Sequence, residues 1–265
     1  MSRDERHVER LTCKSCGKAV EGTFCAHCGQ RAGTKRLTAV GLFTDTLDHV
    51  FDLEAPLIRT TVNCLYRPGW VAKQYAQGQR KVFSNPFKFV LLAVALNVLV
   101  INILGFDIFE AVAVPANNSA TDNSFMPIVN EAMHASIRLS KQYALFFSLV
   151  LLPIYAILIR LLFFKDRWNF IEYIVLGVYV SGAATLVQTL SIPFAAMINI
   201  HIFKWVSFLL FAYYLIGPIQ FCGGNQFVAT LKSFVVVFIY FILQGIFVFG
   251  MGLIVVSVSK EDVAR

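Results

Sequence analysis

"FKFVLLAVALNVLVINILGF", residues 87–106, is an almost unbroken apolar stretch of 20 residues. A helix that rises about 1.5 Å per residue crosses the roughly 30 Å hydrocarbon core of a bilayer with about this number of residues. Similar stretches follow at 143–164, 170–198, 206–221 and 233–257. The sequence therefore predicts an all-α integral membrane protein with about five transmembrane helices within residues 87–258.

The composition of the whole chain supports this class. Hydrophobic residues make up 57% of the 265 residues and charged residues only 15%, and the mean hydropathy is +0.65. These values lie outside the range of soluble globular proteins. Within the membrane part, Pro193 and the pair Gly217–Pro218 leave open whether residues 191–221 form one span or a broken pair.

The distribution of charge predicts the orientation. Residues 1–88 contain 14 Lys and Arg against 8 Asp and Glu, whereas the remaining residues contain 9 against 8. Basic segments beside spans tend to stay in the cytoplasm, and the start of the chain lacks the apolar core of a signal peptide. We therefore expect a cytoplasmic N-terminus, reduced cysteines and an external loop at 107–142.

"CKSCGKAVEGTFCAHCGQR", residues 13–31, contains two CxxC pairs separated by eight residues. Two residues between cysteines allow both sulfurs to face one ion, and a glycine after each pair permits the positive φ that such a turn often needs. The pattern predicts a small zinc ribbon over residues 1–33 that holds a structural Zn²⁺. The predicted ligands are Cys13, Cys16, Cys25 and Cys28.

The rest of this ribbon favours a structural or protein-binding role. Four cysteines leave no open position for catalysis, and we expect His27 to face solvent. One aromatic residue, Phe24, and no dense Lys/Arg run make nucleic-acid binding an unfavoured interpretation. Gln30 and Arg31 follow the second pair, and we expect them to be exposed and to contact a protein partner. Outside the ribbon, Cys64 and Cys222 are interpreted as small apolar residues.

Residues 34–86 are predicted to form cytoplasmic amphipathic helices at the membrane interface. In the first, over 38–53, an apolar stripe recurs at helical spacing, and the opposite face carries three carboxylates and an imidazole. The simplest interpretation of this polar face is a solvated surface. Of the two functional hypotheses, we prefer a surface that docks on the basic residues of 67–88 over a second metal site. Its members are Asp45, Asp48, His49 and Asp52.

A second helix is predicted over 56–66 and is ended by Pro68 and Gly69. Aromatic and basic residues typical of a membrane interface follow it. Ser84 and Pro86 suit the start of the first span.

Amide side chains are the main polar groups inside the predicted spans. In membrane helices, amides usually hold neighbouring helices together by hydrogen bonds, and the alternative is that they line a transport cavity. The amides in question are Asn97, Asn102, Gln188 and Gln244. No nucleophile motif or phosphate-binding loop accompanies them, so we expect no enzymatic activity.

The order of these motifs resembles a known family. The ribbon "CKSCG…FCAHCGQR" and the later stretch "LYRPGWVAKQYAQGQRKVFSNPFKF", followed by several spans, are similar to the bacterial DUF3667 family of uncharacterised membrane proteins. The resemblance implies a bacterial inner-membrane protein and supplies no activity. A cytoplasmic N-terminal region before five spans is also similar in layout to the Yip1-like membrane proteins. The residues that carry the DUF3667 pattern are Cys13, Cys16, Cys25, Cys28, Gly29, Gln30, Pro68, Gly69, Gly78, Arg80 and Pro86.

Two functional hypotheses follow from the sequence. The preferred one is a non-enzymatic membrane protein whose zinc ribbon is a docking or assembly platform for another protein, in contact with membrane lipid and able to form a homo-oligomer. The alternative is a transporter or lipid-handling protein in which the ribbon is a lid or assembly element. An intramembrane enzyme that uses the polar face around His49 is the third and least favoured interpretation.

Overall fold

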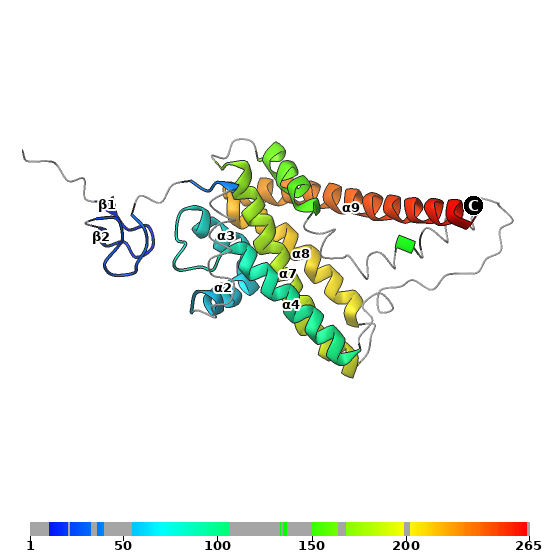
Figure 1. Ribbon diagram of the computed structural model, residues 1–265. Helices are drawn as coiled ribbons and strands as arrows, with labels where there is room; N and C mark the ends of the chain where they lie inside the picture. Colours follow the sequence, from blue (N-terminus) through cyan, green and yellow to red (C-terminus); the bar gives the residue numbers. More distant parts are fainter. Residues whose placement is uncertain are drawn as a thin grey trace, which may run out of the picture.

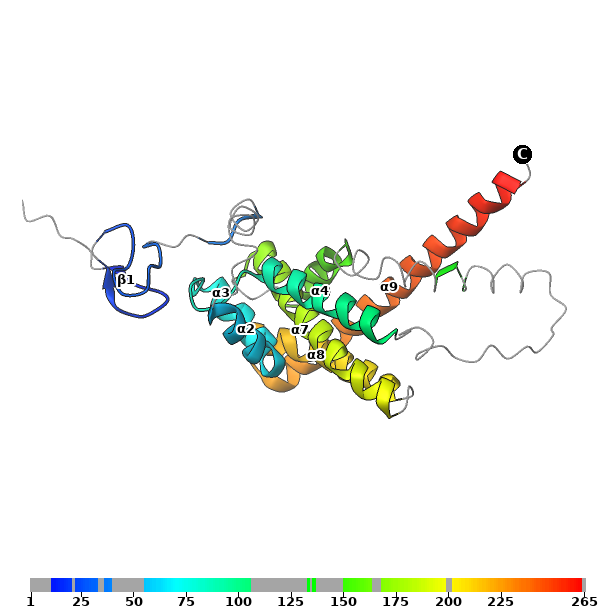
Figure 2. The ribbon, with the colours of Figure 1, turned by 60° about the horizontal axis from the view of Figure 1, so that its bottom comes forward.

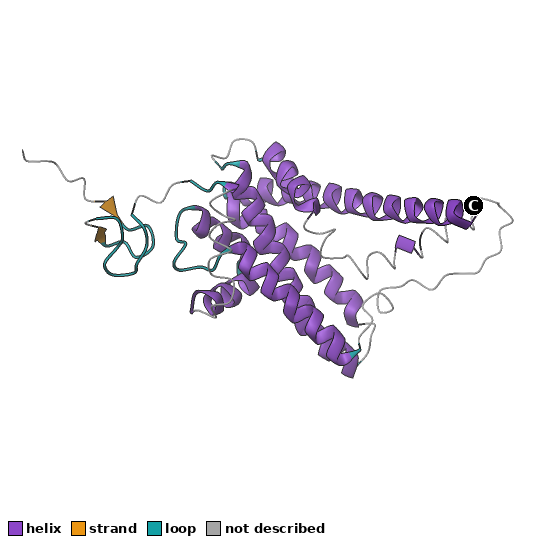
Figure 3. Cartoon of the chain, in the orientation of Figure 1, coloured by secondary structure: helices purple, strands orange, loops and turns teal. Residues whose placement is uncertain are grey.

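The computed structural model describes residues 11–20, 22–32, 36–39, 55–105, 133, 135–136, 150–163, 168–198 and 202–263. Helices make up most of this part of the chain, and the two short strands lie together in a small unit near the N-terminus (Figure 3). The all-α class predicted from the apolar stretches is confirmed. The predicted polar face formed by Asp45, Asp48, His49 and Asp52 lies outside the described residues.

The small unit comprises residues 11–32 and is called the cysteine module below. Strand β1 (Leu11–Thr12) pairs antiparallel with β2 (Ala19–Val20), and an isolated bridge joins Phe24 to Arg31. Its few buried apolar side chains are those of Val20 and the cysteines. A core this small does not stabilise a fold without a metal or another cross-link.

Within the described residues, four helices are long and apolar enough to cross a membrane. They are α4 (Pro86–Leu104), α7 (Phe170–Met197), α8 (Ile202–Cys222) and α9 (Gln226–Val263). They coincide with four of the five predicted spans and give the fold of a multi-pass membrane protein. The remaining predicted span, 143–164, is described from residue 150 onward. A shorter apolar helix runs there over Val150–Leu162.

The region 191–221 contains the end of one helix and most of the next. Helix α7 continues through Pro193 to Met197, and α8 begins at Ile202 and includes Pro218. Most of the predicted loop at 107–142 lies outside the described residues.

Helices α7, α8 and α9 alternate in direction along the chain (Figure 1). Helices α4 and α7 lie side by side and parallel, because Ser84 contacts Tyr179 near one end and Asn97 contacts Thr189 further along. Helix α8 runs back along α7, and α9 leaves the end of α8 and diverges from the other helices (Figures 1 and 2). We call the end where α4, α7 and α9 begin and α8 ends the proximal end.

Two shorter helices, α2 (Ala55–Tyr66) and α3 (Pro68–Ala76), pack at the proximal end. The sequence predicts α2 but not α3, because Pro68 and Gly69 were expected only to stop a helix. In the structure they form the first turn of α3. The Oε1 atom of Gln220 on α8 accepts hydrogen bonds from the N–H groups of Gly69 (3.1 Å) and Trp70 (3.4 Å). It thus satisfies donors that a helix start leaves without partners.

Gly69 also fixes how closely α3 approaches α8. A Cβ atom at this position would lie 2.0 Å from the carbonyl oxygen of Gly217. Only glycine fits there, so the Pro-Gly pair of the sequence motif serves a helix crossing as well as a helix start.

The start of α4 differs by one residue from the prediction. Asn85, not Ser84, is the N-cap, because the Oδ1 atom of Asn85 accepts a hydrogen bond from the N–H of Phe87 at 2.9 Å, and Pro86 occupies the first helical position. The N–H of Ser84 instead donates to the hydroxyl of Thr60 at 2.8 Å, which ties α2 to the start of the first span.

Candidate metal centre

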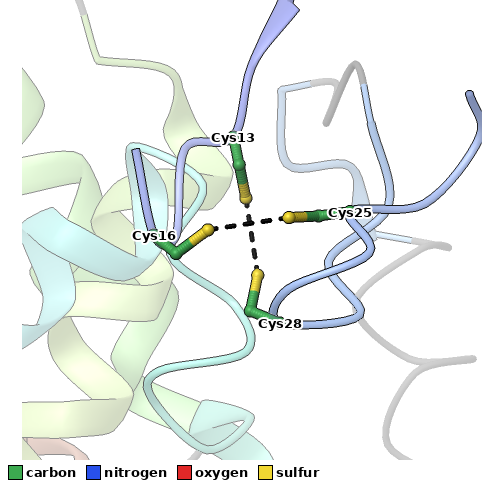
Figure 4. Close-up of side chains that lie close together, drawn as sticks. All are labelled: Cys13, Cys16, Cys25 and Cys28. Atoms are coloured by element: carbon green, nitrogen blue, oxygen red, sulfur yellow. Dashed lines mark hydrogen bonds between the residues drawn. The ribbon is translucent and has the colours of Figure 1, made fainter. Parts of the chain in front are cut away.

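The four sulfur atoms of the cysteine module converge on one point (Figure 4). The Sγ atoms of Cys13 and Cys28 are 3.5 Å apart, those of Cys16 and Cys25 are 3.6 Å apart, and all four lie within 4.8 Å of one another. A Zn–S bond of about 2.3 Å in a tetrahedral site places the sulfurs about 3.8 Å apart. The four cysteines can therefore bind a single four-coordinate metal ion.

Two equivalent turns present these sulfurs. In the first, the N–H of Gly17 donates to the carbonyl of Cys13. In the second, Gly29 donates in the same way to Cys25, and both bonds measure 2.8 Å. Gly17 and Gly29 have φ values of 73° and 69°, as the sequence predicts for the residue after each pair. The matched turns make the module a closed cradle with one cysteine pair on each side.

Backbone N–H groups of the second turn stabilise negative charge on its sulfurs. Those of Cys28 and His27 lower the pKa of the Cys25 thiol to about 7. For Cys28 the N–H of Gln30 lowers the pKa, but burial and the neighbouring sulfurs outweigh it and raise the pKa to about 12. A metal ion that binds at neutral pH must therefore displace at least the proton of Cys28.

Two residues outside the cradle match their sequence-based interpretation. His27 is exposed, as expected for a residue that is not needed as a ligand. Cys64 is fully buried in α2, and burial raises the pKa of its thiol well above the ordinary value. A thiol of this kind is unreactive, in agreement with its interpretation as a small apolar residue.

Gln30 requires a correction, because it is not exposed. Its side chain is 4% exposed, its Nε2 donates to the carbonyl of Gly78 at 3.0 Å, and its Oε1 accepts from the N–H of Lys81 at 3.1 Å. Arg31 beside it is exposed. The expectation failed because the partners of Gln30 lie about 50 residues along the chain, in the loop after α3. We call residues 77–85 the docking loop.

A second connection follows the module. The guanidinium of Arg36 lies 3.4 Å from the carboxylate of Glu172, and the carbonyl of Leu37 accepts a hydrogen bond from Asn169 at 3.3 Å. Asn169 and Glu172 form the capping box at the start of α7. The sequence offered no signal for either bond, since each joins residues more than 130 positions apart.

Two of the four amides of the predicted spans, Asn97 and Asn102, make hydrogen bonds through their side chains. The Nδ2 of Asn97 donates to the hydroxyl of Thr189 at 2.9 Å, which joins α4 to α7. Asn102 is exposed and donates to the carbonyl of Val98 in its own helix. Asn97 thus has the helix-packing role that amides usually have in membranes.

Part of the chain matches the model of a known family. Residues 54–97 match the model of a family described as "Protein of unknown function (DUF3667)". The matched segment contains α2, α3, most of α4 and the docking loop with Gly78 and Lys81. No curated protein and no solved structure matches the chain. The resemblance to DUF3667 is therefore confirmed over residues 54–97, which we call the family segment.

Proposed function

We propose that this protein is a non-enzymatic membrane protein whose cysteine module, loaded with structural Zn²⁺, is a docking or assembly platform for another protein. Four thiolates in a closed tetrahedral arrangement are a preferred ligand set for Zn²⁺. The proposed location is the bacterial inner membrane, with the N-terminus and the proximal end in the cytoplasm, where thiols stay reduced.

The observation that carries the proposal is the pair of hydrogen bonds from Gln30 to the docking loop. A buried side-chain amide that makes two backbone hydrogen bonds holds its segment in one position, because breaking them leaves buried polar groups without partners. The module is thereby fixed on the family segment. A fixed module presents the same surface to a partner at all times, which lowers the entropic cost of binding.

The surface left open supports the same function. The ring of Phe24 is 61% exposed, although the module has very few apolar side chains. His27 and Lys18 are exposed beside the cysteines. Exposed aromatic residues on rigid supports are frequent anchors of protein interfaces.

The test is photo-crosslinking in the native membrane from a crosslinking amino acid at position 27. The proposal expects one protein adduct that disappears in the Phe24→Ala variant and in the Cys25→Ser/Cys28→Ser variant. An adduct with a second copy of the chain would define a homo-oligomer built through the module.

The matched control is Thr12→Ala, which changes an exposed residue of the module away from Phe24. It should leave the adduct unchanged. If no adduct forms, or if the adduct persists in both test variants, the module is not a docking platform.

A further inference from the structure

Helix α2 has two apolar faces, and only one of them packs on the body. Leu57, Thr60 and Cys64 point inward and are 4%, 0% and 0% exposed. On the other side, the spacing of four residues places three large side chains on one ridge. They are Ile58, Val62 and Tyr66, which are 68%, 50% and 76% exposed. We call these three residues the outer stripe.

Two contacts of α2 place it beside the spans, and the first lies at the level where α4 begins. Thr60 accepts from the N–H of Ser84, two residues before Pro86 starts α4. Further along α2, the carbonyl of Leu65 accepts from the hydroxyl of Tyr213, near the middle of α8. Helix α2 therefore lies beside the membrane-spanning helices at the edge of the body (Figures 1 and 2).

The side chains around the outer stripe are those of a membrane interface. Tyr66 on the stripe and Trp70 at the start of α3, 36% exposed, are residue types that concentrate at the boundary between headgroups and acyl chains. Arg59 on α2 and Arg67, the N-cap residue between α2 and α3, are exposed. Their long side chains can reach headgroup phosphates while the stripe contacts acyl chains.

The charged residues around α2 indicate which kind of lipid the helix contacts. Residues 55–105 contain no Asp or Glu and six Lys and Arg, of which Arg59, Arg67 and Lys81 are exposed. A basic surface beside an apolar stripe favours a leaflet that carries anionic phospholipid.

We infer that α2 is an interfacial helix whose outer stripe inserts between the headgroups of an anionic leaflet, with Arg59 and Arg67 bound to lipid phosphate. The inference goes beyond the docking role of the module and does not depend on it. In this arrangement the family segment has two surfaces. Its docking loop binds the cysteine module, and its helix α2 contacts the lipid leaflet.

The test uses the purified full-length chain with a photo-crosslinking amino acid at position 62, reconstituted in two kinds of vesicle. One kind contains phosphatidylcholine alone, and the other contains phosphatidylcholine mixed with phosphatidylglycerol. Mass spectrometry of the irradiated protein identifies the adduct. Position 62 is half exposed, so the probe does not disturb the buried face.

The inference expects lipid adducts in both vesicles. In the mixed vesicles it expects a several-fold enrichment of phosphatidylglycerol over its share of the lipid. The Arg59→Gln/Arg67→Gln variant should lose the enrichment but keep the adduct, and Arg59→Lys/Arg67→Lys should keep both. The same probe at position 18 of the cysteine module, which is also exposed, should give much less lipid adduct.

Other outcomes overturn the inference. An adduct to a second copy of the chain would make the outer stripe a protein interface. Quenching by water without a lipid adduct would place α2 outside the bilayer. Lipid adducts with no preference for phosphatidylglycerol would remove the role of the two arginines.

Discussion

Gln30 is the residue that joins the cysteine module to the family segment. Its replacement by alanine removes both hydrogen bonds to the docking loop and leaves the carbonyl of Gly78 and the N–H of Lys81 without these partners. Each lost bond costs about 1 kcal/mol, so we expect the fraction of undocked module to rise by roughly tenfold or more. Hydrogen exchange of the docking loop measures this change.

The expected pattern separates docking from metal binding. In Gln30→Ala, exchange should increase at residues 78–81 while the metal content stays unchanged, because Gln30 is not a ligand. Gln77→Ala, a change of an exposed residue of the same loop, should leave exchange as it is. Equal exchange in all three proteins would show that the two hydrogen bonds do not hold the module.

The cysteine thiols set the pH dependence of metal binding. With a pKa of about 12, Cys28 carries a proton throughout the neutral range, whereas Cys25, with a pKa of about 7, gains one as the pH falls through neutrality. A metal ion must displace these protons, so its affinity should fall as the pH decreases, by at least about tenfold per pH unit. Competition with a chelator between pH 6 and pH 9 measures the slope, and a flat profile would contradict the assignment of the thiols as ligands.

Helices α3 and α8 cross at Gly69. In Gly69→Ala the new Cβ would lie 2.0 Å from the backbone oxygen of Gly217, which cannot rotate away. Overpacking of this kind costs about 3 kcal/mol or more, so we expect a clear loss of thermal stability in detergent. Gly245→Ala on α9 meets no atom within 4 Å and is the matched control, expected to unfold like the unchanged protein. Similar unfolding temperatures for both variants would mean that α3 does not approach α8 this closely.

The spans, the cysteine pairs and helix α3 show which features a local stretch of sequence can predict. The apolar runs of α4, α7, α8 and α9 are predictable because each fills a membrane span by itself, and the CxxC spacing fixes the metal cradle within one short segment. Helix α3 was missed because Gln220 completes its first turn from 151 residues away. Gln30 was expected to be exposed for the same reason, since its burial depends on a loop 48 residues away. Contacts between distant segments leave no pattern in a single sequence.

The direction of α9 makes the proposed orientation of the whole molecule testable. Helix α9 begins at the proximal end and extends away from it over 38 residues. If the proximal end is cytoplasmic, a reporter fused after residue 265 lies on the opposite side of the membrane. We therefore expect alkaline phosphatase to be active there and a fluorescent protein to be dark, whereas the same fluorescent protein fused before residue 1 should be bright. The reverse pattern would invert the molecule and place the cysteines on the oxidising side.

The central claim is that the chain carries one Zn²⁺ ion in the cysteine module on the membrane-spanning body. Native mass spectrometry of the full-length protein, released from detergent micelles, measures the mass and number of bound metal ions directly. We expect one zinc ion per chain and none in the Cys25→Ser/Cys28→Ser variant. A metal-free chain, an iron-containing group, or zinc that remains in the variant would contradict it.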